Sequence, residues 1–142
     1  MTRWNYYPQT LMPKEFFSKP SKYHSKKIEI DGITFDSKKE AKRYEELKTL
    51  ESLGEIEGLE LQKKFVLIPT QREPDTVGPR GGIKKGKVIE KECAYFADFY
   101  YHDLKADEWV VEDTKSPITR TPVYKVKKKL MLYVHGIRIK EI

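Results

Sequence analysis

Residues 92–115, ECAYFADFYYHDLKADEWVVEDTK, decide how this chain folds. Aromatic and β-branched residues fill two runs, 92–102 and 108–115, and the polar segment 103–107 separates them. Such residues suit a half-buried pleated strand, and a short polar segment between two runs is typical of a hairpin turn. The stretch therefore predicts two adjacent antiparallel strands, the second of them ended by Pro117.

Two aspartates stand out in these strands because of what surrounds them. Asp98 lies among aromatic residues and alanines of the first strand, where an ionised carboxylate is costly to bury without compensation. In the second strand, the alternation of side chains places Asp113 and Lys115 on one face and Glu112 on the other. Because Asp98 and Asp113 lie on neighbouring strands, we expect both to project toward one point at the end of the sheet.

A helix is predicted before these strands, over residues 37–53. Asp36 and Ser37 are both candidates for its N-cap, and Gly54 suits its C-terminal end. Apolar residues at helical spacing are expected to face the core: Ala41, Tyr44, Leu47, Leu50 and Leu53. Glu40 lies at the border of this face, and the remaining charged residues, Arg43 among them, are interpreted as a solvated surface.

A second helix is predicted after the strands, over residues 122–135. Pro122 takes the first helical position, and Gly136 ends the helix. We expect an inward apolar face made of Val123, Val126, Leu130, Val134 and Tyr133. The basic face comprises Lys125, Lys127, Lys128 and Lys129. A last strand is predicted over residues 137–142, where isoleucines alternate with basic residues.

The N-terminal half adds a hairpin and a strand. Residues 27–35 carry isoleucines around Asp31-Gly32, a dipeptide typical of a two-residue hairpin turn. Residues 59–70 are predicted to form a strand that ends near Pro69. The main order is thus helix, three strands, helix, strand. This order predicts an α/β domain with a mixed sheet flanked by helices on both sides.

A long segment rich in glycine and proline, residues 71–91, interrupts the strands and is predicted to be a loop. Its basic residues are Arg72, Arg80, Lys84, Lys85, Lys87 and Lys91. Two interpretations stay open, a basic flap over DNA and a solvated, mobile hairpin tip. Residues 1–27 are interpreted as a tail with interleaved aromatic and basic residues, which either lies along nucleic acid or folds back onto the domain.

Composition limits the classes of function. The chain has 142 residues and a net charge of +6, so one basic domain with a polyanionic partner is expected. A single cysteine, Cys93, excludes an intramolecular disulfide and a zinc site with several cysteines. No apolar stretch approaches the ~20 residues needed to cross a membrane. We therefore expect a cytoplasmic protein without a membrane partner.

The acidic residues predict a metal site. Converging carboxylates repel each other, and a divalent cation commonly relieves the repulsion. Oxygen ligands without His or Cys nearby favour Mg²⁺ or Mn²⁺ over Zn²⁺. Lys115 would reach the same point, and Glu40 would approach it if helix 37–53 packs over this end of the sheet. Such a set is suited to cleavage of a phosphodiester bond. No phosphate-binding glycine loop and no Ser/His/Asp order occurs, so nucleotide-driven and serine-hydrolase chemistry are unsupported.

The pattern of Asp98 followed by Asp113-Thr114-Lys115 resembles the D…(D/E)xK motif of the PD-(D/E)XK nuclease superfamily. The element order resembles the αβββαβ core of that superfamily, which is restriction-endonuclease-like. Glu40 resembles the helical acid of its Holliday-junction-resolvase-like branch. Ala97 stands where the proline of the PD motif would be, which weakens the motif. More narrowly, residues 22–142 resemble a phage and prophage family of unknown function called DUF1064.

The resemblance implies roles for particular residues. Asp98 and Asp113 would bind metal directly, Thr114 would add its backbone carbonyl, and Glu40 would bind directly or through water. Lys115 would position the attacking water. Weaker candidates for contacts with substrate are Gln62, Arg80, Lys84, Lys85, Lys125 and Lys128. A strand shifted by one residue would make Glu112 the inward acid, but the spacing to Lys115 favours Asp113.

The resulting hypothesis divides the chain into a basic, aromatic arm (residues 1–27) and a nuclease-like domain (residues 28–142). Its expected function is phage-type, Mg²⁺- or Mn²⁺-dependent endonuclease activity on DNA, in recombination or replication. Branched DNA is the first expected substrate, and a homodimer would match the two symmetric cuts of a four-way junction. The alternatives are a general DNA nickase, a non-catalytic DNA-binding protein with this fold, and an RNA-directed nuclease.

Overall fold

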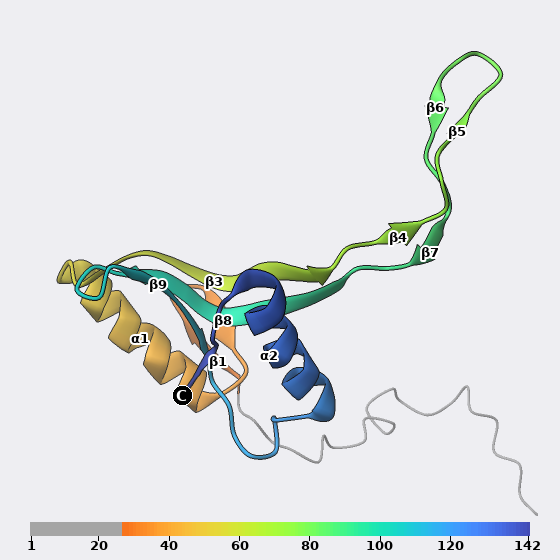
Figure 1. Ribbon diagram of the computed structural model, residues 1–142. Coiled ribbons are helices and arrows are strands. Elements are labelled where there is room, and N and C mark those ends of the chain that lie inside the picture. The colour runs from red at the N-terminus through yellow and green to blue at the C-terminus, as the bar shows by residue number, and fades with distance from the viewer. Residues whose placement is uncertain (1–26) are drawn as a thin grey trace, which may run out of the picture.

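A four-stranded mixed sheet forms the centre of the molecule (Figure 1). The computed structural model describes residues 27–142. The strands lie in the order β10 (Lys140–Glu141), β9 (Glu108–Asp113), β8 (Cys93–Asp103) and β3 (Ile56–Ile68). β3, β8 and β9 are antiparallel neighbours, and β10 pairs with β9 in parallel. The predicted hairpin of β8 and β9 is confirmed, although β9 ends at Asp113 rather than at residue 115.

Two helices cover the sheet, α1 (Lys38–Ser52) and α2 (Pro122–His135). Two consecutive residues of β9 show that α1 and α2 lie on opposite faces of the sheet. Glu112 bonds to Arg43 of α1, whereas the adjacent Val111 belongs to the apolar cluster of α2. Because neighbouring side chains of a strand point to opposite faces, the sheet separates the helices. The prediction of a mixed-sheet α/β domain with helices on both sides is confirmed.

Each helix therefore has its own apolar cluster. The cluster on the α1 side consists of Phe35, Ala41, Tyr44, Leu47, Ile56, Phe99 and Tyr101. The cluster on the α2 side consists of Leu67, Tyr95, Ala97, Val111, Tyr124, Met131 and Ile139. Both clusters draw on β8, which makes this strand the centre of the fold.

Local signals at the start of α1 were predicted correctly. Strands β1 (Ile28–Ile30) and β2 (Ile33–Phe35) form a hairpin, and Asp31 and Gly32 have φ values of 53° and 75°. Both turn residues thus adopt the left-handed conformation that a two-residue hairpin turn requires. Ser37 caps α1 by accepting a hydrogen bond from the backbone N–H of Glu40 at 3.1 Å. The expectation that Leu53 is buried was wrong, because this residue lies beyond the helix and is 67% exposed.

The predicted inward face of α2 was also largely wrong, although Leu130 does pack against the cluster on this side. The helix turns Tyr124 and Met131 toward the sheet, and it leaves several apolar side chains exposed: Val123, Val126, Leu132, Tyr133 and Val134. Two contacts explain this orientation. The Tyr124 hydroxyl donates a hydrogen bond to Glu141 beneath the helix at 2.9 Å. Met131 is fully buried, as suits a flexible side chain that fills irregular space.

The segment predicted as a loop, residues 71–91, is instead a two-stranded arm. It comprises β4 (Gln71–Arg72), β5 (Thr76–Val77), β6 (Ile83–Lys84) and β7 (Val88–Glu90). β4 pairs with β7 and β5 with β6, so the arm prolongs the β3–β8 pair. Figure 1 shows that it extends well beyond the helices and bends between its two halves.

Two further predictions concern the N-terminal arm and membrane-spanning helices. The proposed N-terminal arm, residues 1–27, lies almost entirely outside the described residues. Within residues 27–142, no helix is long and apolar enough to cross a membrane.

Candidate active site

Asp98 sits near the middle of β8 and is held by the end of β9. Its Oδ2 accepts hydrogen bonds from the backbone N–H of Thr114 at 2.8 Å and from the Thr114 hydroxyl at 2.7 Å. On the other side, the amide of Gln62 donates to Oδ1 at 3.3 Å. These bonds orient the carboxylate of Asp98 beside Asp113, which is the last residue of β9 and directly precedes Thr114. Gln62 thus lies next to Asp98, whereas its predicted contact with substrate stays a prediction.

The backbone around Asp98 is irregular. Ala97 and Phe99 are two residues apart, yet Ala97 packs on the α2 side and Phe99 on the α1 side. Residues two apart in a regular strand share a face, so the alternation reverses at Asp98. The facing residue of β3, Gln62, has a φ of 51°. This left-handed conformation is unfavourable for a residue with a side chain, and such strain is concentrated at functional sites.

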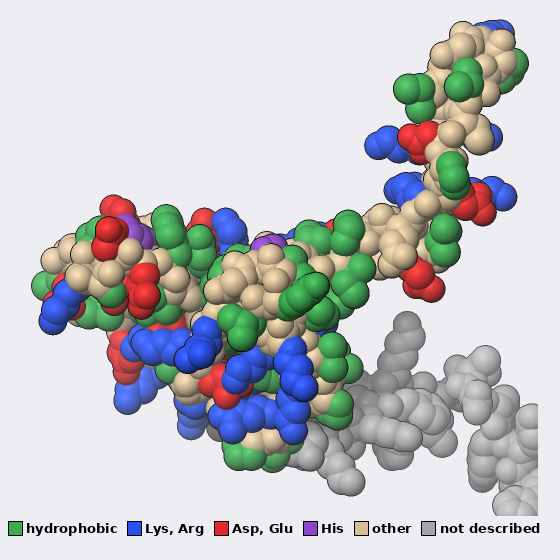
Figure 2. Space-filling view, viewed as in Figure 1, with side chains coloured by type: hydrophobic (Ala, Val, Ile, Leu, Met, Phe, Trp, Pro, Cys, Tyr) green, Lys and Arg blue, Asp and Glu red, His purple; other side chains and the backbone are tan. Residues whose placement is uncertain are grey.

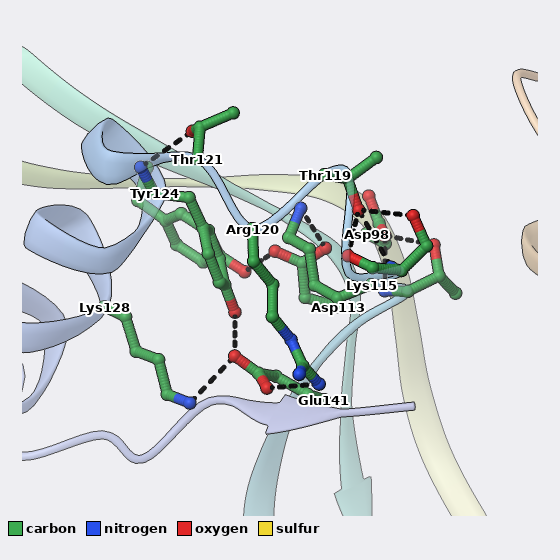
Figure 3. A network of polar contacts seen from close by, with 12 residues as sticks. Asp98, Asp113, Lys115, Thr119, Arg120, Thr121, Tyr124, Lys128 and Glu141 are labelled. Atoms are coloured by element: carbon green, nitrogen blue, oxygen red, sulfur yellow. Dashed lines mark hydrogen bonds and ion pairs between the residues drawn. The ribbon is translucent and has the colours of Figure 1, made fainter.

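Asp113 is buried and only partly compensated (Figure 3). Its Oδ2 accepts a hydrogen bond from the Tyr95 hydroxyl at 2.6 Å. Its Oδ1 lies 2.8 Å from Nζ of Lys115 as an ion pair, but no described donor meets hydrogen-bond geometry at this oxygen. Burial raises the pKa of Asp113 to about 6, and the charge of Asp98 adds to the rise, although Lys115 and Tyr95 oppose it.

Lys115 is held in place from two directions. Its side chain is 18% exposed, and its Nζ lies 4.4 Å from the ring centroid of Tyr124 in addition to its ion pair with Asp113. A cation over an aromatic face is attracted by the ring. The backbone N–H of Lys115 donates to the carbonyl of Ile142 at 3.0 Å. The ammonium is therefore fixed beside both the acid and helix α2.

Glu40 comes to the same region from the first turn of α1. Its pKa is raised to about 7, first by burial and then by the negative charges of Asp98 and Asp36, with a smaller contribution from Asp113. The negative charges of both aspartates thus act on Glu40. The carboxyl is half-protonated near neutral pH, which is unusual for a glutamate.

A Glu40→Gln variant is expected to be more stable than the wild type at pH 8. A folded-state pKa of about 7, above the unfolded value of 4.5, gives stability that is complete below pH 4.5 and lost as the pH rises through 7. Glu40 is partly exposed, so solvent screening reduces the expected gain to about 1 kcal/mol. Urea unfolding without metal at pH 5 and pH 8 measures it. Glu45→Gln, on the exposed side of α1, is the control and should show no such difference. A Glu40→Gln protein less stable at pH 8 would contradict the expected strain.

The donor set fits a hard divalent cation. Asp98 and Asp113 are adjacent carboxylates, Asp113 Oδ1 lacks a hydrogen bond, and neither His nor Cys contributes. In residues 27–142, no three His, Cys, Asp or Glu side chains lie close enough together to hold one metal ion. Glu40 and the two aspartates therefore do not form a closed three-carboxylate group in this structure. In this arrangement the ammonium of Lys115 supplies the positive charge that Asp113 requires.

Glu112 is not part of this site. It is fully buried on the α1 side, where Arg43 donates to both carboxylate oxygens at 2.8 and 2.7 Å. Tyr101 and Lys140 also bind it. The alternative register with Glu112 as the inward acid is therefore wrong. The interpretation of Arg43 as a solvated residue was wrong as well, because a contact between distant segments decides its position.

The comparison with protein families concerns almost the whole chain. Residues 20–140 match the family described as "Protein of unknown function (DUF1064)". The chain belongs to DUF1064. No curated protein and no solved structure matches it. The family assignment agrees with the resemblance in the sequence and leaves the activity of this DUF1064 protein to be argued from its site.

A basic groove runs beside the candidate site of the DUF1064 protein, between α2 and the C-terminal strand. It is lined by Arg120, Tyr124, Lys125, Lys128, Lys129, Leu132, Arg138, Ile139 and Glu141. Glu141 binds Arg120 at 3.0 Å and Lys128 at 2.8 Å. Figure 2 shows Lys and Arg side chains gathered around α2 on this face. Lys125 and Lys128, two of the predicted phosphate contacts, therefore lie next to the acidic site.

The other weak candidates lie elsewhere. Lys84 is in β6, and Arg80 and Lys85 flank that strand, all on the arm and remote from Asp98 in the fold. The analysis of the sequence missed two residues that shape the site, Tyr95 and Tyr124. Both lie within apolar patterns, so nothing in the sequence indicates that their hydroxyl groups donate hydrogen bonds to carboxylates.

Proposed function

We propose that this DUF1064 protein is a divalent-metal-dependent DNA endonuclease with a site of the PD-(D/E)XK type. One observation carries the proposal. The buried Asp113 has an oxygen without a hydrogen bond, and it lies beside a second carboxylate, Asp98, and an ion-paired lysine, Lys115. A chain gains no stability from two adjacent acids in a buried place, so the arrangement is best explained by a bound cation.

The residues that would hold Mg²⁺ or Mn²⁺ are Asp98, Asp113, the backbone carbonyl of Thr114 and, directly or through water, Glu40. A bound cation of this kind lowers the pKa of water and neutralises charge on a phosphoryl group. The charge that Lys115 now supplies to Asp113 would then be supplied by the cation. Lys115 would become available to the reacting groups while Tyr124 keeps it in position.

In the proposed reaction, water adds to the phosphorus atom of a DNA phosphodiester. A bond forms between the water oxygen and phosphorus, one ester P–O bond breaks, and the leaving oxygen takes up a proton. Lys115 orients the water and stabilises the negative charge that develops on the phosphoryl oxygens. The carboxylate of Glu40, on the first turn of α1, would take the proton of the water.

Two features support DNA as the substrate. The net charge is +6, and the basic groove along α2 is lined in part by Tyr124, which also contacts Lys115. Lys125, Lys129 and Arg138 make no ion pair with the residues that the structure describes, so their charges are available to phosphates. A DNA strand bound in this groove would have its phosphate backbone close to Asp98 and Asp113.

Branched DNA processed by a homodimer is the form of the activity that we favour. A symmetric junction presents two equivalent cuts, and α2 exposes an apolar stripe that includes Val123, Val126 and Tyr133. Burial of this stripe between two copies would give the dimer. Light scattering of the full chain checks it, and a monomer at every concentration with a junction bound would contradict it.

The test of the function is a cleavage assay. The wild type and Asp113→Asn are incubated with Mg²⁺, with Mn²⁺ and with EDTA on a four-way junction, a flap, a linear duplex, single-stranded DNA and single-stranded RNA. We expect cleavage by the wild type with metal only, and most rapidly at the junction. Equal cleavage of all DNA forms would identify a general nickase instead. Equal cleavage by Asp113→Asn, or tight binding without any product, would overturn the proposal.

A further inference from the structure

The arm of residues 71–91 has a defined bend rather than a flexible tip. At the bend, the Gly86 N–H donates to Asp75 at 2.9 Å, and Arg72 donates to the Gly86 carbonyl at 3.2 Å. The Glu73 N–H donates to the carbonyl of Lys87 at 2.9 Å. A Cβ atom at Gly86 would lie 1.8 Å from the carbonyl oxygen of Glu73, so only glycine allows this approach. The bend is therefore built into the sequence and aims the outer half away from the sheet.

The outer half combines apolar and basic side chains in a way that its own fold does not use. Val77 and Ile83 are directly opposed in the β5–β6 pair and are 76% and 79% exposed. Residues 76–85 contain three basic residues, Arg80, Lys84 and Lys85, and no Asp or Glu. Figure 2 shows this part standing clear of the rest of the molecule, with apolar side chains on its surface.

We propose that the arm binds in the major groove of duplex DNA, to one side of the candidate active site. That the partner is DNA rests on the proposed function, whereas the mode of binding is argued from the structure of the arm. A two-stranded ribbon fits the major groove, about 12 Å wide, but not the minor groove, about 6 Å wide. In this position the lysines face the phosphates, and Val77 and Ile83 face the floor, where thymine presents a methyl group.

The charge of the arm decides between nucleic acid and a protein partner. An exposed apolar pair alone would suit either. Three cations without a single acid, in the turn and on the returning strand of the outer half, suit the phosphates that border a groove. Glu73 and Asp75 lie at the bend, where the side chain of Asp75 accepts a hydrogen bond from Gly86, so neither acid belongs to the outer half.

Binding without cleavage tests the arm independently of the nuclease. A fluorescent 30-base-pair duplex is titrated with the full chain in EDTA, and anisotropy is followed at several salt concentrations. The variant Arg80→Ala/Lys84→Ala/Lys85→Ala should bind at least about tenfold more weakly, and its salt slope should fall by about 2–3, as expected for three phosphate contacts. The charge-matched control Lys42→Ala/Lys48→Ala/Lys105→Ala, with all three lysines away from the arm, should keep the wild-type slope.

The groove is tested with the same duplex. Glucosylated hydroxymethylcytosine fills the major groove and should lower wild-type affinity toward that of the arm variant, whereas netropsin, which fills the minor groove, should leave it unchanged. Val77→Ser/Ile83→Ser should weaken binding severalfold at an unchanged salt slope, with circular dichroism confirming the fold. Competition by netropsin instead, or equal slopes for the arm variant and its control, would overturn the arm proposal. So would an arm variant that loses dimerisation but not DNA affinity.

The two proposals fail in different ways. Arm-dependent binding in EDTA, with no cleavage of any substrate with metal, would overturn the nuclease and leave the arm proposal standing. Cleavage by the wild type with arm-independent binding would overturn the arm proposal and leave the nuclease standing.

Discussion

Replacing Lys115 with methionine is expected to slow DNA cleavage by roughly 10²–10³-fold, the usual loss when one charge-stabilising group is removed from a reacting phosphate or carbonyl. Methionine keeps most of the length and the packing over Tyr124 but removes the ammonium beside Asp113. DNA affinity in EDTA should change little, because only one of many positive charges is lost. Single-turnover cleavage of the preferred substrate, with affinity measured in parallel, gives both values.

The matched control is Lys39→Met. Lys39 lies in the same neighbourhood, since its Nζ donates to the backbone carbonyl of Lys115 at 3.2 Å, yet the contact is exposed. The variant removes the same charge without removing the ammonium from Asp113, so cleavage should stay within about threefold of wild type because exposed charges are screened. Equal losses in both variants would mean that Lys115 acts only through the overall charge of this region.

Lys115→Met also has a consequence for the metal. Lys115 lowers the pKa of Asp113, which burial has raised to about 6, so the pKa should rise further in the variant. At neutral pH more of Asp113 is then protonated, and a divalent cation must displace that proton. The variant should therefore need more Mg²⁺ for half-maximal cleavage at pH 6.5 than at pH 8.

Much of the site could be predicted because it depends on local regularities. The alternation of β9 carries on to Lys115, two residues after Asp113, and Asp98 and Asp113 lie directly next to the last paired residues, Phe99 and Glu112, because a short turn joins β8 to β9. The N-cap at Ser37 fixes where α1 begins, and with it the position of Glu40. Each of these features is set by residues near in sequence.

The features that could not be predicted depend on contacts between distant segments. The apolar stripe of α2 predicted the wrong inward face, since the hydrogen bond from Tyr124 to Glu141 and the space filled by Met131 are properties of the assembled fold. The strands of the arm could not be predicted, because glycine and proline are typical of loops. They are defined by the pairing of β4 with β7 and of β5 with β6. The ion pair of Arg43 with Glu112 spans 69 positions, so no local pattern could indicate it.

That ion pair leads to the largest expected effect on stability. Arg43→Met should lower the free energy of unfolding by about 3–5 kcal/mol at pH 7, because it leaves Glu112 charged and fully buried with fewer partners. Tyr101 and Lys140 still bind the carboxylate in the variant, but Arg43 supplies the two-point contact that joins α1 to β9. Urea unfolding followed by circular dichroism measures the loss.

The dependence on pH identifies the cause of that loss. Burial alone would raise the pKa of Glu112, but the bonds from Arg43, Tyr101 and Lys140 outweigh it and leave the pKa lowered. A lowered folded-state pKa gives stability that is present above the unfolded value near 4.5 and lost as the pH falls through the folded value. The difference between wild type and Arg43→Met should therefore shrink as the pH is lowered from 7 toward 3.

The double variant Arg43→Met/Glu112→Met completes the argument. Removing both charges leaves no buried ion without a partner, so the double variant should regain most of the stability lost in Arg43→Met. Lys48→Met, which breaks an exposed pair with Glu51 on the same helix, should cost no more than about 1 kcal/mol. A double variant as unstable as Arg43→Met would show that the arginine acts through packing rather than charge. Recovery would show that Glu112 constrains α1 electrostatically, and so helps to hold Glu40, on the same helix, near the two aspartates.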